Sequence, residues 1–555
     1  MNKFKTVCLT AAIASSSATF AGGLLTNTNQ NIAFLRNPAR DAAIAIDGVY
    51  SNPAGVAFLD NGFHLSLNFQ NAHQTRTITS TFAPFAYGVS NNGEMTKKFK
   101  GEANAPVIPS VQAAYNKGPW SFQFNFAVTG GGGKCTFDNG LASFESNAAL
   151  LPLLSQNMDA LTTAMGIGQL GLPTVDKYNM DTYMHGRQYY FGFTLGAAYK
   201  INNNWSVYGG LRMLYGSANY YGYVKNIRAV IGGQEVMASE TFKNGAVEAL
   251  TGAGKAAEAA QLYQQAGDIV NAQKYAAMAR EYTIKGTMLG ALGEATTDVT
   301  LNCDQTGWGV APILGVDYRT GNFNFAAKYE FKTRMRLKNK SANSESAANL
   351  AILDRYQDGK SVADDSPALL TVGSQWSALP SLRFSAGWHY YFDKDGHQYD
   401  NHEHKLGGNT NEYLLGAEYD VNKFLQVSAG GQITRYNFTD DYMEDISFNV
   451  SSYSLGVGVG IQATKNIKVN LAYFQTFYND YNREQQNYNN TADMAAKIVA
   501  GVAKELQGDE AAAGAAQLTK TMLTTPRQDG HSMLYGKDSF TRTNRVIGVG
   551  VDFKF

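Results

Sequence analysis

WSFQFNFAV, residues 120–128, alternates strictly between apolar and polar side chains, with aromatic residues on one face. A period of two predicts a strand with one apolar and one polar face. The same alternation recurs at residues 453–461, 467–473 and 547–555, where the sequence ends on Phe555. A soluble β-sandwich would explain one such strand. Repetition over many strands, together with the export signal and the final aromatic residue described below, favours an all-β, transmembrane antiparallel β-barrel.

The composition agrees with a barrel. Only 17% of the 555 residues are charged, whereas 12% are aromatic and 56 are glycine. Soluble domains carry about 25% charged residues. The 46 basic and 46 acidic side chains cancel, so charge gives no reason to expect a nucleic-acid partner. No stretch reaches the roughly 20 apolar residues of a membrane helix, so a membrane protein of this composition would have to be a barrel.

The first 21 residues have the pattern of a signal peptide. Basic residues at 2–5 precede an apolar run at 6–13, and small residues lead to a cleavage site after Ala21. Removal of residues 1–21 leaves two cysteines, Cys135 and Cys303, as a candidate disulfide in an oxidising compartment. They lie above predicted strands that are three apart, so the sequence leaves both the bonded and the free state open.

About fourteen strands are predicted. They lie near residues 62–72, 106–116, 119–129, 187–200, 204–217, 306–318, 322–335, 367–378, 381–392, 411–420, 424–437, 448–463, 466–478 and 542–555. Short and long connections alternate between them, which is typical of outer-membrane barrels with short periplasmic turns. Aromatic residues such as Trp120, Tyr199, Trp205 and Trp376 flank the short turns on the outward phase, as an interfacial belt requires.

Residues 22–61 are irregular and precede the first strand. They contain the turn DGVYSNPAG at 47–55, in which Asn52, Pro53 and Ala54 form a candidate hatch motif. Proline fixes one φ angle and glycine permits a positive one, so a built turn is expected. An ordinary surface turn is the alternative. Because about forty irregular residues precede a chain that is otherwise mostly strand, we expect this segment to lie in the lumen of the barrel.

Three of the long loops have helical composition: 145–165, 244–292 and 491–523. The second is expected to form two helices, broken near Gly267-Asp268. Two arrangements are open. The helices form a polar cap, or their apolar faces meet outside the membrane in an apolar groove.

Taken together, these features resemble the FadL-type outer-membrane transporters of long-chain fatty acids and other hydrophobic compounds. The resemblance rests on the signal, the irregular segment with Asn52-Pro53-Ala54, fourteen alternating strands, the stretches 196–206 and 307–318, and Phe555. It implies a bacterial outer-membrane protein that is no enzyme and takes up hydrophobic molecules by passive diffusion. Expected partners are a long-chain fatty acid or another hydrophobic small molecule, outer-membrane lipid, and the barrel assembly machinery, with Phe555 as assembly signal.

In that family the N-terminal segment is a hatch that plugs the lumen, and ligand leaves sideways at a kink in the third strand. The resemblance therefore implies a candidate lateral gate at the glycines that follow the third predicted strand, 119–129, namely Gly130, Gly131, Gly132 and Gly133. The glycines together with Lys134 also look like a phosphate loop, but no Ser or Thr follows the lysine. The other interpretation is that the glycines merely begin a loop.

A carboxylate ligand would need a cation in the lumen. Candidate head-group residues on inward phases are Arg212, Lys328, Lys332 and Arg334. The alternative is that these cations pair with Glu330, Glu418 and hatch acids such as Asp41 and Asp47 in a wet lumen.

No cofactor or metal is expected, and no nucleophile motif or carboxylate pair indicates catalysis. Four histidines, at 389, 397, 402 and 404, leave a haem or metal receptor open as a rival function. A structural or adhesive barrel is the second rival.

Overall fold

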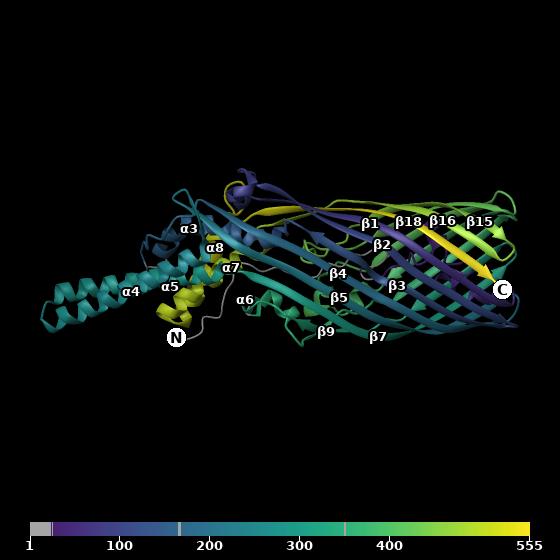
Figure 1. The fold of residues 1–555 in the computed structure, drawn as a ribbon, viewed down its shortest axis with the longest axis horizontal. Coiled ribbons are helices and arrows are strands. Elements are labelled where there is room, and N and C mark those ends of the chain that lie inside the picture. Colours follow the sequence, from purple (N-terminus) through teal and green to yellow (C-terminus); the bar gives the residue numbers. More distant parts are fainter. Residues whose placement is uncertain (1–23, 25, 165–167, 349–350) are drawn as a thin grey trace.

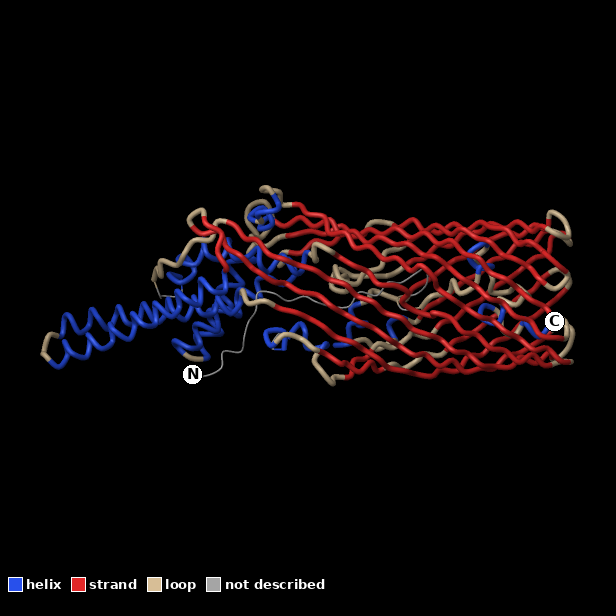
Figure 2. Tube along the Cα trace, in the orientation of Figure 1, coloured by secondary structure: helices blue, strands red, loops and turns tan. Residues whose placement is uncertain are grey.

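The computed structural model describes residues 24, 26–164, 168–348 and 351–555. The expected signal peptide lies outside this part of the chain. All described strands belong to one antiparallel sheet of 18 strands, which closes because β1 pairs with both β2 and β18. Figures 1 and 2 show the resulting barrel with helices gathered at one end. Fourteen of these 18 strands form the wall of the barrel, so the predicted fourteen-strand barrel is confirmed.

Fourteen strands form the wall: β1 (Gly62–Phe82), β2 (Thr96–Lys117), β3 (Trp120–Phe137), β4 (Lys177–Lys200), β5 (Trp205–Ile231), β7 (Val299–Thr320), β8 (Phe323–Glu330), β11 (Leu369–Leu379), β12 (Leu382–Tyr391), β13 (Thr410–Asp420), β14 (Leu425–Arg435), β15 (Ser452–Thr464), β16 (Ile467–Tyr478) and β18 (Gly536–Lys554). Four short strands extend it: β6 (Gln234–Met237), β9 (Arg336–Ser341), β10 (Ser361–Ala363) and β17 (Tyr481–Gln485).

The wall has two heights. Strand β5 has 27 residues and β4 has 24, whereas β12 has 10 and β13 has 11. A tilted transmembrane strand needs about 9–11 residues, so β1–β5, β7 and β18 continue well past the membrane. Figure 1 shows this taller side leading to the helices. The strands predicted at 62–72, 106–116, 187–200 and 204–217 were therefore too short at their upper ends.

The sequence pattern did not predict these upper segments, because the polarity of the two faces inverts along each tall strand. Low on β1, Phe69 is exposed on the outer face and Asn68 is buried in the lumen. Higher up, Ile78 and Phe82 are buried on the inner face while Thr79 lies outside. The lower part is therefore apolar outside, as lipid requires, and the upper part is apolar inside, as a water-exposed domain requires.

The inner faces of the tall strands are covered by helices. The helical loops are confirmed as α3 (Ala142–Ala164), the pair α4 (Ala238–Gln265) and α5 (Ile269–Ala295), and the pair α7 (Thr491–Gln507) and α8 (Asp509–Thr524). Their apolar residues join those of the strands in one large core, which includes Phe82, Phe144 and Val499. Helices α4 and α5 continue outward as a hairpin that turns at Gly267 (Figure 1). No helix in the described residues is long and apolar enough to cross a membrane.

The strand expected at 322–335 is wrong beyond Glu330. Residues 331–335 leave the ladder with β7, and the chain resumes pairing with β7 only in β9. The cause lies in β7, where Gly307 and Gly309 have no side chains and the backbone of residues 334–336 packs directly against them. Met335 is thereby buried against Tyr190 inside the barrel.

Candidate functional site

The lumen is occupied by residues 26–61, which we call the hatch. It contains two short helices, α1 (Ile32–Arg36) and α2 (Gly48–Ser51), and a single 3-10 turn, η1 (Gly55–Phe58). Asn31 caps α1 by accepting a hydrogen bond from the Ala33 amide at 2.7 Å, and its Nδ2 donates to Gln112 of β2 at 2.9 Å. The polar inner face of the barrel therefore hydrogen-bonds the hatch.

Small side chains on the wall let the hatch backbone approach closely. A Cβ atom at Gly456 would clash with the carbonyl oxygen of Leu35, and one at Gly548 would clash with Ile32. Gly416 is likewise covered by Asn37. These glycines occupy inward positions of strands whose outward residues are apolar. The sequence carried this signal, but it can be recognised only once the hatch is known to lie there.

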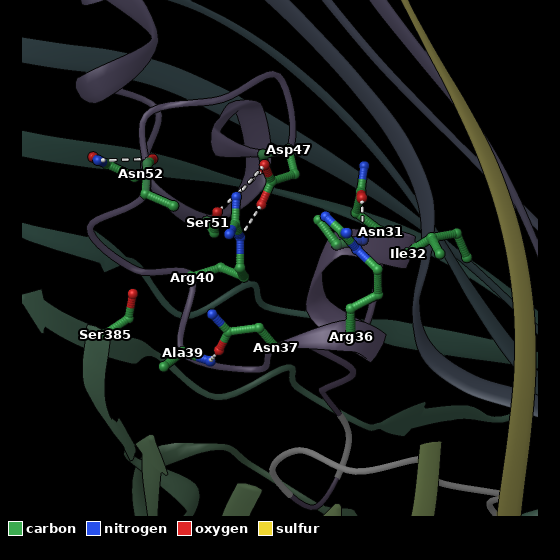
Figure 3. Close-up of polar contacts among 12 residues, drawn as sticks. Asn31, Ile32, Arg36, Asn37, Ala39, Arg40, Asp47, Ser51, Asn52 and Ser385 are labelled. Carbon is green, nitrogen blue, oxygen red and sulfur yellow. Dashed lines mark hydrogen bonds and ion pairs between the residues drawn. The ribbon is translucent and has the colours of Figure 1, made fainter. Parts of the chain in front are cut away.

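Charged residues join the hatch to the lower barrel. Arg40 donates to both carboxylate oxygens of Asp47, at 2.8 and 3.0 Å, and lies 3.0 Å from Glu418 of β13 (Figure 3). Arg36 lies 3.7 Å from the same glutamate. Buried charges need such partners. The sequence indicated Glu418 and Asp47 as lumen acids but not Arg40 as their partner, because nothing in the spacing relates residue 40 to residue 418.

The hatch motif Asn52-Pro53-Ala54 is held by three different strands. Asn52 Nδ2 donates to Asp317 of β7 at 2.6 Å. The Pro53 carbonyl accepts from Gln123 of β3 at 2.7 Å, and the Ala54 carbonyl accepts from Ser206 of β5 at 2.7 Å. Asn52 Oδ1 also accepts from the Gly55 amide at 3.2 Å. The motif thus fixes the end of the hatch to the barrel wall.

Two of the candidate head-group residues lie together beside Tyr50 of the hatch. Arg212 forms a buried ion pair with Glu330, and Lys328 Nζ lies 2.6 Å from the same carboxylate. Lys328 also donates to the Tyr50 carbonyl at 2.8 Å, and both cations face the Tyr50 ring. Pairing with Glu330, one of the two readings of the sequence, is the arrangement observed.

The other two candidates lie elsewhere because the strand breaks after Glu330. Lys332 donates to the carbonyl of Asp395 at 2.6 Å, and Arg334 is exposed. The inward phase assumed for them holds only while residues 322–335 remain one strand. They do not join Arg212 and Lys328.

The hydrogen-bonded ladder between β2 and β3 is interrupted. These strands pair at Asn104–Lys134 and again at Ser110–Ala127, with no ladder between them. On β2 the interval contains Pro106 and Pro109, which have no amide to donate. On β3 it contains the predicted glycines Gly130, Gly131, Gly132 and Gly133. We call this interval the wall gap.

Glycine is required on the β3 side of the wall gap. Gly131 has φ +68°, and a Cβ atom there would clash with the backbone of Gln188 on β4. The register with β4 shifts twice, on either side of residues 130–131. Inside the barrel the hatch reaches this point: the Asn27 amide donates to the Thr129 carbonyl at 2.7 Å, and Asn27 Nδ2 donates to the Gly131 carbonyl at 2.7 Å. Hatch residue Asn27 therefore replaces β2 as a partner of β3.

The remaining candidate residues are separated. Cys135 on β3 and Cys303 on β7 are both buried free thiols, with β4 and β5 between them, so the candidate disulfide is not formed. His389 points into the lumen, where it bonds Asp41 and Glu412. The other three histidines lie in the loop above β12, and no group of three metal-ligating side chains occurs among the described residues. Phe555 bonds the backbone of Phe63 at the short-turn end.

Above the hatch, a cavity of about 470 Å³ lies between the loops and is lined mainly by charged and polar side chains, which include Arg355, His402, Glu444, Asp445 and Arg483. The helices bury their apolar faces in the cap, so this cavity is not the apolar groove considered from the sequence. Burial raises the pKa of Asp445 to about 6, although hydrogen bonds from Ser143 lower it.

No protein-family profile matches the sequence, and no curated protein matches it. Solved structures do match over nearly the whole chain. A FadL homologue from Pseudomonas aeruginosa has 11% identity over 96% of this chain and 100% of its own, with a TM-score of 0.56. A TodX deltaS2S3 mutant, described as a monoaromatic hydrocarbon channel, has 13% identity over 95% of this chain and 99% of its own, with a TM-score of 0.50. The chain therefore has the fold of FadL-type outer-membrane barrels.

Proposed function

We propose that this protein resides in the bacterial outer membrane and takes up hydrophobic molecules by passive diffusion. In this proposal the hatch plugs the lumen and the ligand leaves sideways through the wall gap. The observation that supports it is that residues 26–61 occupy the lumen and reach the interruption of the β2–β3 ladder. Residues 26–61 are held by contacts from β1, β2, β3, β5, β7 and β13, and Asn27 of the same segment lies at the gap.

Sideways exit suits an apolar ligand for a physical reason. Keeping one CH2 group away from water is worth roughly 0.8 kcal/mol, so a water-filled path is costly for a long chain. Passage from a protein pocket into the bilayer avoids that cost throughout. The fold likeness extends to proteins described as a FadL homologue and as a monoaromatic hydrocarbon channel. Long-chain fatty acids and monoaromatic compounds are accordingly the first ligands to test.

For a fatty acid, Arg212 and Lys328 are the proposed head-group residues. Both already hold one carboxylate, that of Glu330, beside the hatch residue Tyr50. A ligand carboxylate that entered this site would compete with Glu330 and disturb the Lys328–Tyr50 contact. Ligand binding would thereby be linked to the position of the hatch.

A reversible tether tests the exit path. The variant Asn27→Cys/Thr129→Cys, with Cys135 and Cys303 changed to Ala, joins two residues whose backbones are hydrogen-bonded across the gap. The matched control is Thr75→Cys/Thr543→Cys, a directly paired site on β1 and β18 away from the gap. We expect oxidation to block uptake of labelled oleate and toluene by cells only in the first variant, and reduction to restore it. Normal uptake by the oxidised gap variant would favour a path past the hatch into the periplasm.

A further inference from the structure

The lipid-facing side of β3, β4, β5 and β7 carries an apolar hollow of about 690 Å³. It is lined by Phe126, Phe191, Phe193, Met213, Tyr215 and Trp308 alone. All six belong to the outward phase of their strands, so the hollow faces the bilayer rather than the lumen. The hollow lies outside the ligand path proposed above, which runs through the lumen and the wall gap. A barrel can form without such a hollow on its outer surface.

Two cations lie above the hollow. Lys134 of β3 and Arg187 of β4 are directly opposite each other in the ladder, and both are exposed on the outer face. Like charges in directly opposite positions destabilise a sheet. Neither belongs to any ion pair within the described chain. The described part of the chain therefore supplies no acidic partner for either cation, and an external anion would relieve their repulsion.

A continuous column connects the cations to the hollow. The Arg187 guanidinium lies 6.0 Å from the centre of the Tyr189 ring, and Tyr189 stacks on Phe191 with ring centres 5.6 Å apart. Phe191 follows Arg187 by four positions along β4, which corresponds to a distance of about 13 Å. An anionic head and an apolar chain on one molecule would match this spacing.

The height of the column agrees with a lipid of the outer leaflet. Tyr199 lies beside a short turn, and Tyr189 ends the apolar outer face of β4. The stretch between them is about the 9–11 residues that cross a bilayer. Arg187 and Lys134 are then at the level of the outer head groups, and the hollow is at the level of the acyl chains.

We propose that this surface binds one anionic lipid of the outer leaflet, with a phosphate group of the lipid between Lys134 and Arg187 and an acyl chain in the hollow. Guanidinium groups bind phosphate oxygens in pairs, and basic residues near a membrane surface attract anionic lipids. Lys134 also forms the upper rim of the wall gap, paired with Asn104. If the gap is the exit, which is the function proposed above, the bound lipid lies beside it.

Native mass spectrometry of the purified, folded protein tests this inference. The probes are dipalmitoyl phosphatidylglycerol and the zwitterionic dipalmitoyl phosphatidylcholine. We expect wild-type protein to retain one phosphatidylglycerol in preference to phosphatidylcholine, and Lys134→Gln/Arg187→Gln to bind it about 30-fold more weakly. The control Lys98→Gln/Lys225→Gln removes the same charge from other outward positions and should bind like wild type. Met213→Trp, which fills the hollow, should weaken binding of the dipalmitoyl lipid but not of a dihexanoyl analogue.

Equal binding by the cation variant and its control would overturn the inference, as would equal retention of the two head groups. Displacement of phosphatidylglycerol by equimolar oleate would assign the site to a carboxylate ligand instead and would also overturn it. Because binding is measured on purified protein, the result does not depend on whether the barrel transports anything.

Discussion

Replacing Asn52 with alanine should release the end of the hatch without altering the barrel wall. The substitution removes the hydrogen bond from Asn52 Nδ2 to Asp317, 2.6 Å long, and the one that Asn52 Oδ1 accepts from the Gly55 amide at 3.2 Å. The first has a charged acceptor and contributes about 1.5–3 kcal/mol, and the second about 0.5–1.5 kcal/mol. Asp317 keeps its bond from Asn324 at 2.8 Å, so it is not left wholly unpaired.

The expected loss is therefore about 2–4 kcal/mol of hatch attachment, with the barrel strands unaffected. Since 1.4 kcal/mol changes an equilibrium tenfold, a loss of 3 kcal/mol raises the population of the detached hatch by about 150-fold. Amide hydrogen exchange of residues 48–58 should accelerate by that order in Asn52→Ala. Ion conductance in planar bilayers should rise as well, because detachment opens the lumen.

The control is Asn61→Ala, which removes an exposed asparagine that bonds the Gly118 amide at the adjacent turn. It should leave both measurements unchanged. If exchange in residues 48–58 of Asn52→Ala accelerates less than about threefold, the hatch is held mainly by its other contacts. The motif would then have no special role, and the reasoning would be refuted.

Three further outcomes are expected. Gly131→Ala should lower the free energy of unfolding by about 1–3 kcal/mol and reduce the fraction of protein that keeps its folded mobility on unheated gels. The control Gly118→Ala, also at positive φ but facing open space, should cost about 1 kcal/mol. Equal effects would contradict the clash with Gln188. Glu330→Gln should destabilise the barrel by about 3–5 kcal/mol. Oleate should raise the melting temperature of this variant more than that of wild type, whereas toluene should not. The absence of an oleate effect would exclude Arg212 and Lys328 as head-group residues. Burial raises the pKa of Asp445 to about 6, so the folded state holds this proton more tightly than the unfolded state. The free energy of unfolding should therefore fall by about 2–3 kcal/mol as pH rises from 4 to 7. Asp445→Asn should remove that slope, and an unchanged slope would exclude Asp445 as its source.

The sequence predicted the barrel well because the membrane imposes a local rule. Lipid requires apolar residues at every second position, as in residues 120–128, and that rule can be read without knowledge of any partner. The helices of the loops were equally local, and the break at Gly267 follows from one residue type. The upper halves of the tall strands were missed because their inner faces pack on a helical cap and their outer faces do not meet lipid, so the inward residues there, such as Ile78, are apolar.

The candidate site was less predictable because its contacts join distant residues. That Asn52 belongs to the hatch could be inferred from its turn, but that Asp317 receives its hydrogen bond could not. The error at Lys332 and Arg334 has the same origin. Their phase was extrapolated from Lys328 through residues where the backbone departs toward Gly307 and Gly309, and the only indication lay on another strand.

The positions of the two wall interruptions connect these features. Both the wall gap and the departure after Glu330 occur where glycines remove side chains, at residues 130–133 on β3 and at Gly307 and Gly309 on β7. In each case buried hatch or lumen backbone takes the place left by a strand: Asn27 at β3, and residues 334–336 at β7. Unpaired backbone groups facing lipid are costly, so an opening in the wall is tolerable only where such a replacement satisfies it. The replacement at β7 is continuous with the wall, whereas the replacement at β3 belongs to the hatch. The interruption at β3 can therefore change when the hatch moves, which is why uptake should respond to the Asn27–Thr129 tether.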